Sequence, residues 1–320
     1  MKIRLVDVDG KIPNFALMKI STYHKRIGDD VGWYEPLLDS EDTDILYMAK
    51  VFTFTEDYEY LPTKAKVIKG GTGYDYTTKL PEEIESITEL DYSLYPDCDY
   101  SIIFTTRGCV RKCPFCIVPK KEGVIHNIPV ASLNPRGKYI KVLDNNFFAN
   151  RTWRENIKLL KSFGQPLDFN TGIDLRLLTE EQCKALKSLK IKYIHCAWDS
   201  YKDKEIILPK LEMLCKYIKP YKIIVYTLVG FETEEIVATD IERVMTLKSY
   251  GVKPFAMGYI DFENPRHEKH KSVTDFCRWV NRREIFFNTS WEDYRTSTPK
   301  EEYTQELNIF NVYDDTQCNK

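Results

Sequence analysis

The sequence lacks a large excess of charge of either sign. Its 46 Lys and Arg residues against 48 Asp and Glu residues leave a formal net charge of −2 over 320 residues. No overall positive field therefore predicts binding to nucleic acid or to an anionic membrane. Three arginines could still form a local basic patch, namely Arg278, Arg282 and Arg283.

Long apolar runs and a disulfide pattern are missing as well. There is no stretch of 18 apolar residues, and the N-terminal MKIRLVDVDG becomes charged too early for a targeting segment. The nine cysteines are an odd number, and three of them lie in one loop, so a disulfide framework is not expected. We therefore expect a globular protein of the reducing cytoplasm with no membrane partner.

One short stretch carries the strongest chemical signal. Residues 105–119 read TTRGCVRKCPFCIVP and directly follow the apolar run 102–104. The cysteines of this stretch are Cys109, Cys113 and Cys116. Their C-x3-C-x2-C spacing lets three thiolates converge on one cubane iron–sulfur cluster. No fourth cysteine follows at ferredoxin-like spacing, which predicts a fourth iron left open for a small ligand. Arg111 and Lys112 would offset the negative charge of such a cluster.

Two other interpretations of the cysteines are a zinc knuckle and three unrelated thiols. Zinc sites usually combine two C-x2-C halves or add histidines, and no second half lies nearby. Cys98, eleven residues before Cys109, is either an extra ligand or a buried free thiol, and we expect the thiol.

The loop resembles the signature of the radical S-adenosylmethionine superfamily, C-x3-C-x-aromatic-C, with Phe115 in the aromatic position. The resemblance implies a [4Fe-4S] cluster whose open iron is chelated by S-adenosyl-L-methionine. It also implies reductive cleavage of that cofactor to a 5′-deoxyadenosyl radical. A one-electron reductant such as flavodoxin or ferredoxin is then the expected protein partner.

Residues 1–95 are predicted to form a small Rossmann-like α/β domain, since β-branched strand patterns alternate with a helical pattern after Pro13. Gly70-Gly71-Thr72-Gly73 follows the fourth predicted strand. It matches neither the dinucleotide fingerprint nor a P-loop, and it is either a tight turn or a ligand-binding turn.

The place of this domain before the cluster loop resembles the cobalamin-binding domain of many radical enzymes of the superfamily. The Asp-x-His-x-x-Gly motif of that domain is absent, because residues 7–11 read DVDGK. We therefore predict a degenerate cobalamin-binding-like domain, and cobalamin held by a histidine is not expected.

Residues 96–262 alternate strand and helix patterns. The predicted strands are 101–105, 139–143, 167–170, 193–198, 223–228 and 254–260. Thr179 begins a capping box, and the stretch from Glu232 to Tyr250 has helical periodicity with Gly251 after it. This pattern predicts a partial parallel (β/α)6 barrel, the fold that the resemblance also implies, and chemistry at the C-terminal ends of its strands.

The ends of the second and third barrel strands carry candidate cofactor ligands. Asp144 and Asn145 stand where the family often has Gly-Gly-Glu, and their oxygens could accept hydrogen bonds from the methionine amino group. Asp174 and Arg176 are two residues apart and point to the same side of an extended chain. Arg176 is either a clamp on the cofactor carboxylate or half of an ion pair at the barrel rim.

The next two strand ends are similar. Asp199 and Ser200 occupy the place where superfamily members commonly contact the ribose hydroxyls. Gly230 and Glu232 resemble part of the family's Gly-Φ-x-Glu-Thr stretch, although Thr233 as an ordinary helix N-cap would explain the same residues. His195 and Cys196 are interpreted as packed residues.

Residues 263–320 are predicted to form a helical and aromatic extension, with one amphipathic helix over 272–286. The charged run 266–271 is interpreted as solvated.

The predicted function is a radical S-adenosylmethionine enzyme that abstracts hydrogen from a substrate that the sequence does not identify. The alternatives are a cobalamin-dependent radical methyltransferase and a tRNA methylthiotransferase-like enzyme. The latter usually has an upstream three-cysteine domain and a C-terminal RNA-binding barrel, neither of which is visible here. A non-enzymatic iron–sulfur protein would not need a six-stranded barrel.

Overall fold

The computed structural model describes residues 1–261, 264, 269–294 and 296, and the run 266–268 and the C-terminal residues lie outside them. The chain divides into two compact units. The first contains Met1–Gly172 and Leu189–Lys192, and the second contains Ile173–Ser188, Tyr193–Asp261 and the described C-terminal residues. No helix in the described residues is long and apolar enough to span a bilayer.

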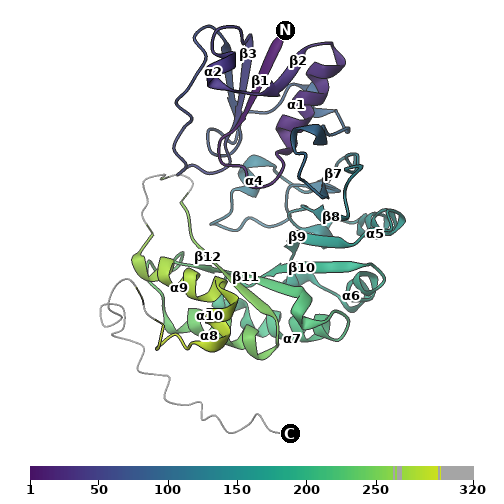
Figure 1. Cartoon of the computed structure of the whole chain (residues 1–320). Coiled ribbons are helices and arrows are strands. Elements are labelled where there is room, and N and C mark those ends of the chain that lie inside the picture. The colour runs from purple at the N-terminus through teal and green to yellow at the C-terminus, as the bar shows by residue number, and fades with distance from the viewer. Residues whose placement is uncertain (262–263, 265–268, 295, 297–320) are drawn as a thin grey trace, which may run out of the picture. The chain divides into compact units, whose positions relative to one another are not determined.

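The first unit begins with a four-stranded parallel sheet (Figure 1). Its strands are β1 (Lys2–Asp7), β2 (Asp30–Trp33), β3 (Ile45–Ala49) and β4 (Lys66–Gly70), in the order β2-β1-β3-β4. Helix α1 (Phe15–Arg26) follows β1. It begins at Phe15 because the Asn14 side chain caps it, accepting hydrogen bonds from the backbone amides of Ala16 and Leu17. Short α2 (Pro36–Asp39) follows β2. This parallel arrangement confirms the predicted Rossmann-like sheet.

The connection to the barrel strands is short and well packed. It contains α3 (Glu82–Glu85) and the 3-10 turn η1 (Tyr92–Leu94). One apolar cluster joins Ile3 of β1 and Leu17 of α1 to Ile102 and Leu143. The boundary proposed after residue 95 stays a prediction, as does the one at residue 262.

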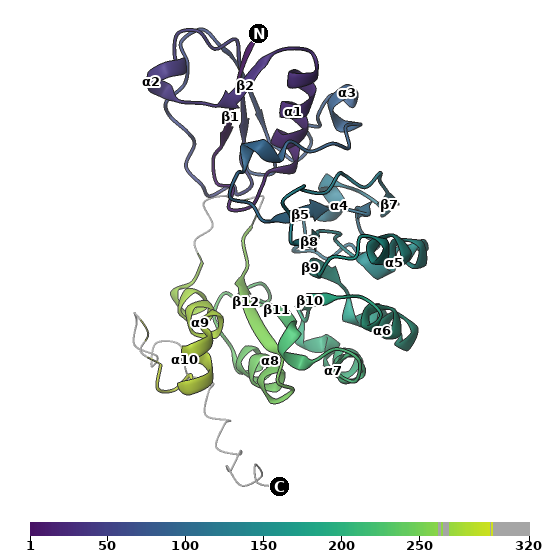
Figure 2. The ribbon, with the colours of Figure 1, turned by 45° about the vertical axis from the view of Figure 1, so that its right-hand side comes forward.

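Six further strands form one parallel sheet in the order β12-β11-β10-β9-β8-β5. They are β5 (Tyr100–Ile103), β8 (Tyr139–Val142), β9 (Leu167–Ile173), β10 (Ile191–Ala197), β11 (Ile223–Val229) and β12 (Lys253–Gly258). The connecting helices are α5 (Trp153–Ser162), α6 (Glu180–Lys187), α7 (Lys204–Cys215) and α8 (Ala238–Ser249). This alternation confirms the predicted fold, and Figure 2 shows α7 and α8 beside strands β10–β12 of the second unit.

Several short elements lie between the main strands and helices along the chain. Strands β6 (Thr106–Arg107) and β7 (His126–Asn127) pair antiparallel, and α4 (Val118–Lys121) lies between them in the sequence. The remaining 3-10 turns are η2 (Phe147–Ala149), η3 (Leu175–Leu177), η4 (Tyr201–Asp203) and η5 (Pro220–Lys222).

Local helix signals succeeded at one helix and failed at another. The capping box of α6 is present, with reciprocal hydrogen bonds between Thr179 and Gln182. The helix predicted from Glu232 begins instead at Ala238, so the alternative interpretation of Thr233 as its N-cap is wrong. The Asp240 carboxylate accepts from the backbone amide of Val237 and fixes the later start. Gly251, with φ of +70°, follows the helix as predicted.

The C-terminal helix prediction was too long. Two helices occupy the region, α9 (Lys271–Asn281) and α10 (Arg283–Asn288), because the backbone of Arg282 leaves the helical conformation with ψ of 94°. Their buried aromatic side chains, including Phe276, Trp279 and Phe286, form a core with Trp291.

Candidate functional site

The cysteine loop lies between β6 and α4 of the first unit. Cys109, Cys113 and Cys116 are all half-buried. Gly108 before them has φ of +78°, and a Cβ there would lie 2.5 Å from the carbonyl oxygen of Val124. Only glycine fits this turn without moving the backbone, so the conformation of the loop start is determined by that residue.

Glu122 connects the start of the cysteine loop to Asn145 through hydrogen bonds. Its carboxylate accepts from the Gly108 backbone amide at 2.9 Å and from the Asn145 side chain at 2.6 Å. Its other oxygen lies 2.7 Å from the Arg107 guanidinium. The sequence interpretation missed Glu122, because no spacing rule connects it with residues 14 and 23 positions away.

Asp144 is a second anchor of the loop. Its carboxylate accepts from the backbone amide of Thr105 at 2.7 Å and from the hydroxyls of Thr105 at 2.5 Å and Thr106 at 2.8 Å. Burial raises the pKa of Asp144, although these donors oppose the shift. Both oxygens hold the strand that leads into the cysteines, and the predicted contact of Asp144 with a cofactor amino group remains a prediction.

Gly172 allows the backbone of β9 to lie close to the backbone of Asp144. A Cβ at Gly172 would lie 1.8 Å from the Asp144 carbonyl oxygen, so the two strand ends are in backbone contact. The neighbouring Thr171 hydroxyl donates to the same carbonyl oxygen at 3.0 Å. The segment after β8 that contains Asp144 and Asn145 is therefore closely packed against β9.

The donor set of the loop fits an iron–sulfur cluster. The Cys109 sulfur already accepts from the backbone amide of Arg111 at 3.4 Å and from the Asn146 side chain at 3.7 Å. No three His, Cys, Asp or Glu side chains in the described part of the chain surround a single metal-ion position. A cubane does not require that arrangement, because each thiolate binds a different iron. The three thiolates and the two donors to Cys109 fit a cubane cluster.

Phe115, between the last two cysteines, is half-buried. Cys98 is also half-buried, and its thiol lies 3.3 Å from the Tyr100 carbonyl oxygen.

In the second unit the structure brings Arg176 together with two carboxylates. Its guanidinium lies 2.8 Å from Asp174 and 3.0 Å from Asp203. These hydrogen-bonded acids raise the pKa of Arg176 against the opposing effect of burial. The ion-pair interpretation therefore describes the contacts seen, and the carboxylate clamp stays a prediction.

Arg243 organises the ends of β10 and β11 and was not found from the sequence. It is 3% exposed and donates to the carbonyl oxygens of Trp198, Asp199 and Leu228. Its partner Asp240 lies 2.5 Å away on the same helix. The only signal in the sequence was an Asp and an Arg three residues apart.

Ser200 and Glu232, both predicted site residues, contact each other. The Ser200 hydroxyl lies 3.3 Å from the Glu232 carboxylate. Gly230, with φ of +75°, makes the turn between β11 and Glu232. The predicted contacts of these three residues with a cofactor remain untested.

Asp199 should make folding stability depend on pH. Burial raises its pKa from 3.8 to about 6, partly offset by Arg243 and Arg176. Between these values the folded protein holds a proton that the unfolded chain has released, so stability falls as pH rises. Above pH 6 the cost is on the order of 3 kcal/mol. Asp199→Asn should remove this slope in urea unfolding between pH 4 and pH 7, and equal slopes for both proteins would contradict it.

The N-terminal sheet offers no histidine to a cobalamin. The only histidine of residues 1–95 is His24, whose ring nitrogens lie 2.7 Å from Asp29 and 3.1 Å from the Tyr47 hydroxyl. Gly71 in the glycine-rich turn has φ of +97°, and a Cβ there would lie 2.4 Å from the Lys50 carbonyl oxygen. The turn therefore serves at least as a backbone turn that needs glycine. A histidine-ligated cobalamin does not fit this domain.

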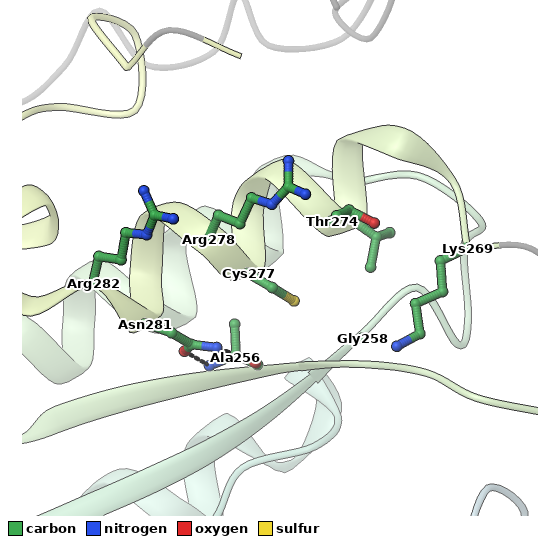
Figure 3. A pocket seen from close by; sticks show the side chains of 9 residues that line it. Ala256, Gly258, Lys269, Thr274, Cys277, Arg278, Asn281 and Arg282 are labelled. Carbon is green, nitrogen blue, oxygen red and sulfur yellow. Dashed lines mark hydrogen bonds between the residues drawn. The ribbon is translucent and has the colours of Figure 1, made fainter. Parts of the chain in front are cut away.

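A cavity of about 430 Å³ lies between α9 and β12 of the second unit (Figure 3). Arg278 and Arg282 of the predicted basic patch line it, together with Lys269. The Asn281 amide pairs with both backbone polar groups of Ala256, as an adjoining strand would. Burial raises the pKa of the Cys277 thiol to about 11, so this thiol stays protonated near neutral pH. The cavity therefore lies where α9 covers β12, an edge strand of the six-stranded sheet.

No protein-family model matches the sequence, and no curated protein matches it. Solved structures do match. One is the radical S-adenosylmethionine methyltransferase TsrM from Kitasatospora setae with cobalamin and a [4Fe-4S] cluster bound. The TM-score is 0.55 at 13% sequence identity, over 81% of this chain and 75% of that one. The chain has the fold of a radical S-adenosylmethionine methyltransferase.

A second structure of TsrM, with tryptophan and the cofactor analogue aza-SAM bound, gives a TM-score of 0.54 at 13% identity. It covers 81% of this chain and 72% of that chain. The likeness confirms the fold-level resemblance to the radical S-adenosylmethionine superfamily.

Proposed function

We propose that this protein is a radical S-adenosylmethionine enzyme. The observation that carries the proposal is the loop of three half-buried cysteines, which lies between β6 and α4 on a fold that radical enzymes use. Its substrate is not identified by any side chain described above. A one-electron donor of the flavodoxin or ferredoxin type is the proposed partner.

The residues of the chain have distinct roles in this proposal. Cys109, Cys113 and Cys116 would hold a [4Fe-4S] cluster, which when bound supplies the electron that cleaves S-adenosyl-L-methionine. Asp144 and Glu122 fix the two ends of segment 105–108, which leads directly into the first cysteine. Their buried hydrogen bonds hold the loop without relying on the cluster.

In the second unit the polar strand ends are proposed to bind the cofactor. Asp199 in its ionised form and Glu232 supply acceptors suited to ribose hydroxyls. Arg176 would bind a carboxylate only by giving up part of its contact with Asp174 or Asp203. Radical chemistry also requires exclusion of water, since a primary carbon radical attacks almost any C–H bond.

Cobalamin-dependent methyl transfer is the second candidate. It is favoured by the likeness to TsrM, which extends over 81% of the chain and so beyond the six-stranded sheet alone. Because the ring nitrogens of His24 are engaged, a cobalamin bound by this chain would take no axial histidine from residues 1–95.

The test is reductive turnover. Anaerobically reconstituted protein with strong reductant should convert S-adenosyl-L-methionine to methionine and 5′-deoxyadenosine, measured by liquid chromatography and mass spectrometry. A deuterated cell extract as substrate source should then place deuterium in the deoxyadenosine, because the primary radical abstracts hydrogen from a C–H bond.

Two other outcomes are decisive. Transfer of a labelled methyl group that requires added cobalamin, without deoxyadenosine, would select the second candidate. An intact cluster that cleaves no cofactor under either condition would refute both.

A further inference from the structure

Asn146 is a buried polar residue beside the first cysteine of the loop. The residue is only 2% exposed. It lies three positions after Leu143, the predicted end of the second barrel strand. The Oδ1 atom accepts no hydrogen bond within the described residues. Burying an amide oxygen without a partner costs about 1–3 kcal/mol. We therefore expect another contact of the same side chain to offset this cost.

That interaction is with sulfur. The Asn146 Nδ2 atom lies 3.7 Å from the Cys109 sulfur, the one hydrogen-bond partner of this side chain in the described structure. The backbone amide of Arg111 lies 3.4 Å from the same sulfur. Cys109 therefore has one donor from its own loop and one from the end of β8.

The position of Asn146 is fixed by its backbone. Its carbonyl oxygen accepts from the Ala149 amide at 3.2 Å, which closes the turn η2. Phe147, the next residue, is fully buried and packs against Phe169. The amide is thus held near the sulfur by the protein core, and its orientation does not depend on a bound ligand.

Hydrogen bonds to a cysteine sulfur stabilise the more negative state of a cluster more than the less negative state, and so raise its reduction potential. We propose that Asn146 is a positioning residue that donates an N–H···S hydrogen bond to Cys109 and raises the reduction potential of the cluster. This inference rests on the proposed function, because it requires the cysteine loop to hold a cluster.

The variant test uses Asn146→Leu and Asn146→Asp, which both remove the donor, while only the second adds a charge. Asn150→Leu is the control, because Asn150 is also buried but bonds to Asn127 rather than to sulfur. Redox titrations of the reconstituted proteins, followed by electron paramagnetic resonance, should give a lower midpoint potential for both Asn146 variants. The control should match the wild type. Iron content must equal that of the wild type in each sample compared.

A measurement on the unaltered protein covers the case in which the variants lose the cluster. Protein labelled with nitrogen-15 asparagine should show a labelled nitrogen coupled to the reduced cluster in pulsed electron paramagnetic resonance. A full cluster with no such coupling, or with unchanged potentials in both Asn146 variants, overturns this inference alone. Wild-type protein that takes up no cluster instead refutes the proposed function.

Discussion

Replacing Cys109, Cys113 and Cys116 together by alanine is expected to abolish cluster assembly, from about one four-iron cluster per chain to none. The three thiols are the only cysteines of the loop, and their spacing suits the three protein ligands of one cluster. The measurement is iron and sulfide content with absorption spectra after anaerobic reconstitution. Cofactor cleavage should disappear with the cluster.

The matched control is Cys98→Ala. Cys98 is half-buried like the loop cysteines, but its thiol lies 3.3 Å from the Tyr100 carbonyl oxygen and precedes the loop. Cluster content should be unchanged in this variant. Stoichiometric zinc with no iron–sulfur absorption in the wild type would show that the loop is a different kind of site.

Asp144→Ala is expected to destabilise the first unit by about 3 kcal/mol or more, since three buried donors lose their acceptor at once. Thr105 and Thr106 are buried, so their donors would lose this acceptor inside the protein. Urea unfolding of the apoprotein measures the loss. The same variant should take up less cluster, because the segment leading to Cys109 is released.

Asp144→Asn separates loss of the acceptor from loss of charge. The amide keeps one oxygen acceptor and the size of the side chain, so it should recover part of the stability. Because burial raises the pKa of Asp144, removing its charge is less costly than removing its hydrogen bonds. A loss below about 1 kcal/mol for Asp144→Ala would show that the three contacts do not anchor the loop.

The fold was largely readable from the sequence because its signals are local. Parallel strands buried on both faces are short apolar runs, and all ten predicted strands appear in the two parallel sheets. The capping box at Thr179 needs only residues three apart. The start of α8 was wrong because a competing contact decided it: Asp240, paired with Arg243, caps the amide of Val237.

What the sequence by itself determined is the cysteine loop with its proposed chemistry, since that chemistry depends on the spacing of three thiolates within eight residues. Only the tertiary structure identified Glu122, Asn146 and Arg243. Their partners lie up to 45 residues away along the chain and are brought close by the strand ends. The contacts of Asp144 with threonine hydroxyls and of Arg176 with two carboxylates are likewise visible only in the tertiary structure. A polar residue at a strand end can face a ligand or a neighbouring strand, and burial and hydrogen-bond partners decide between them.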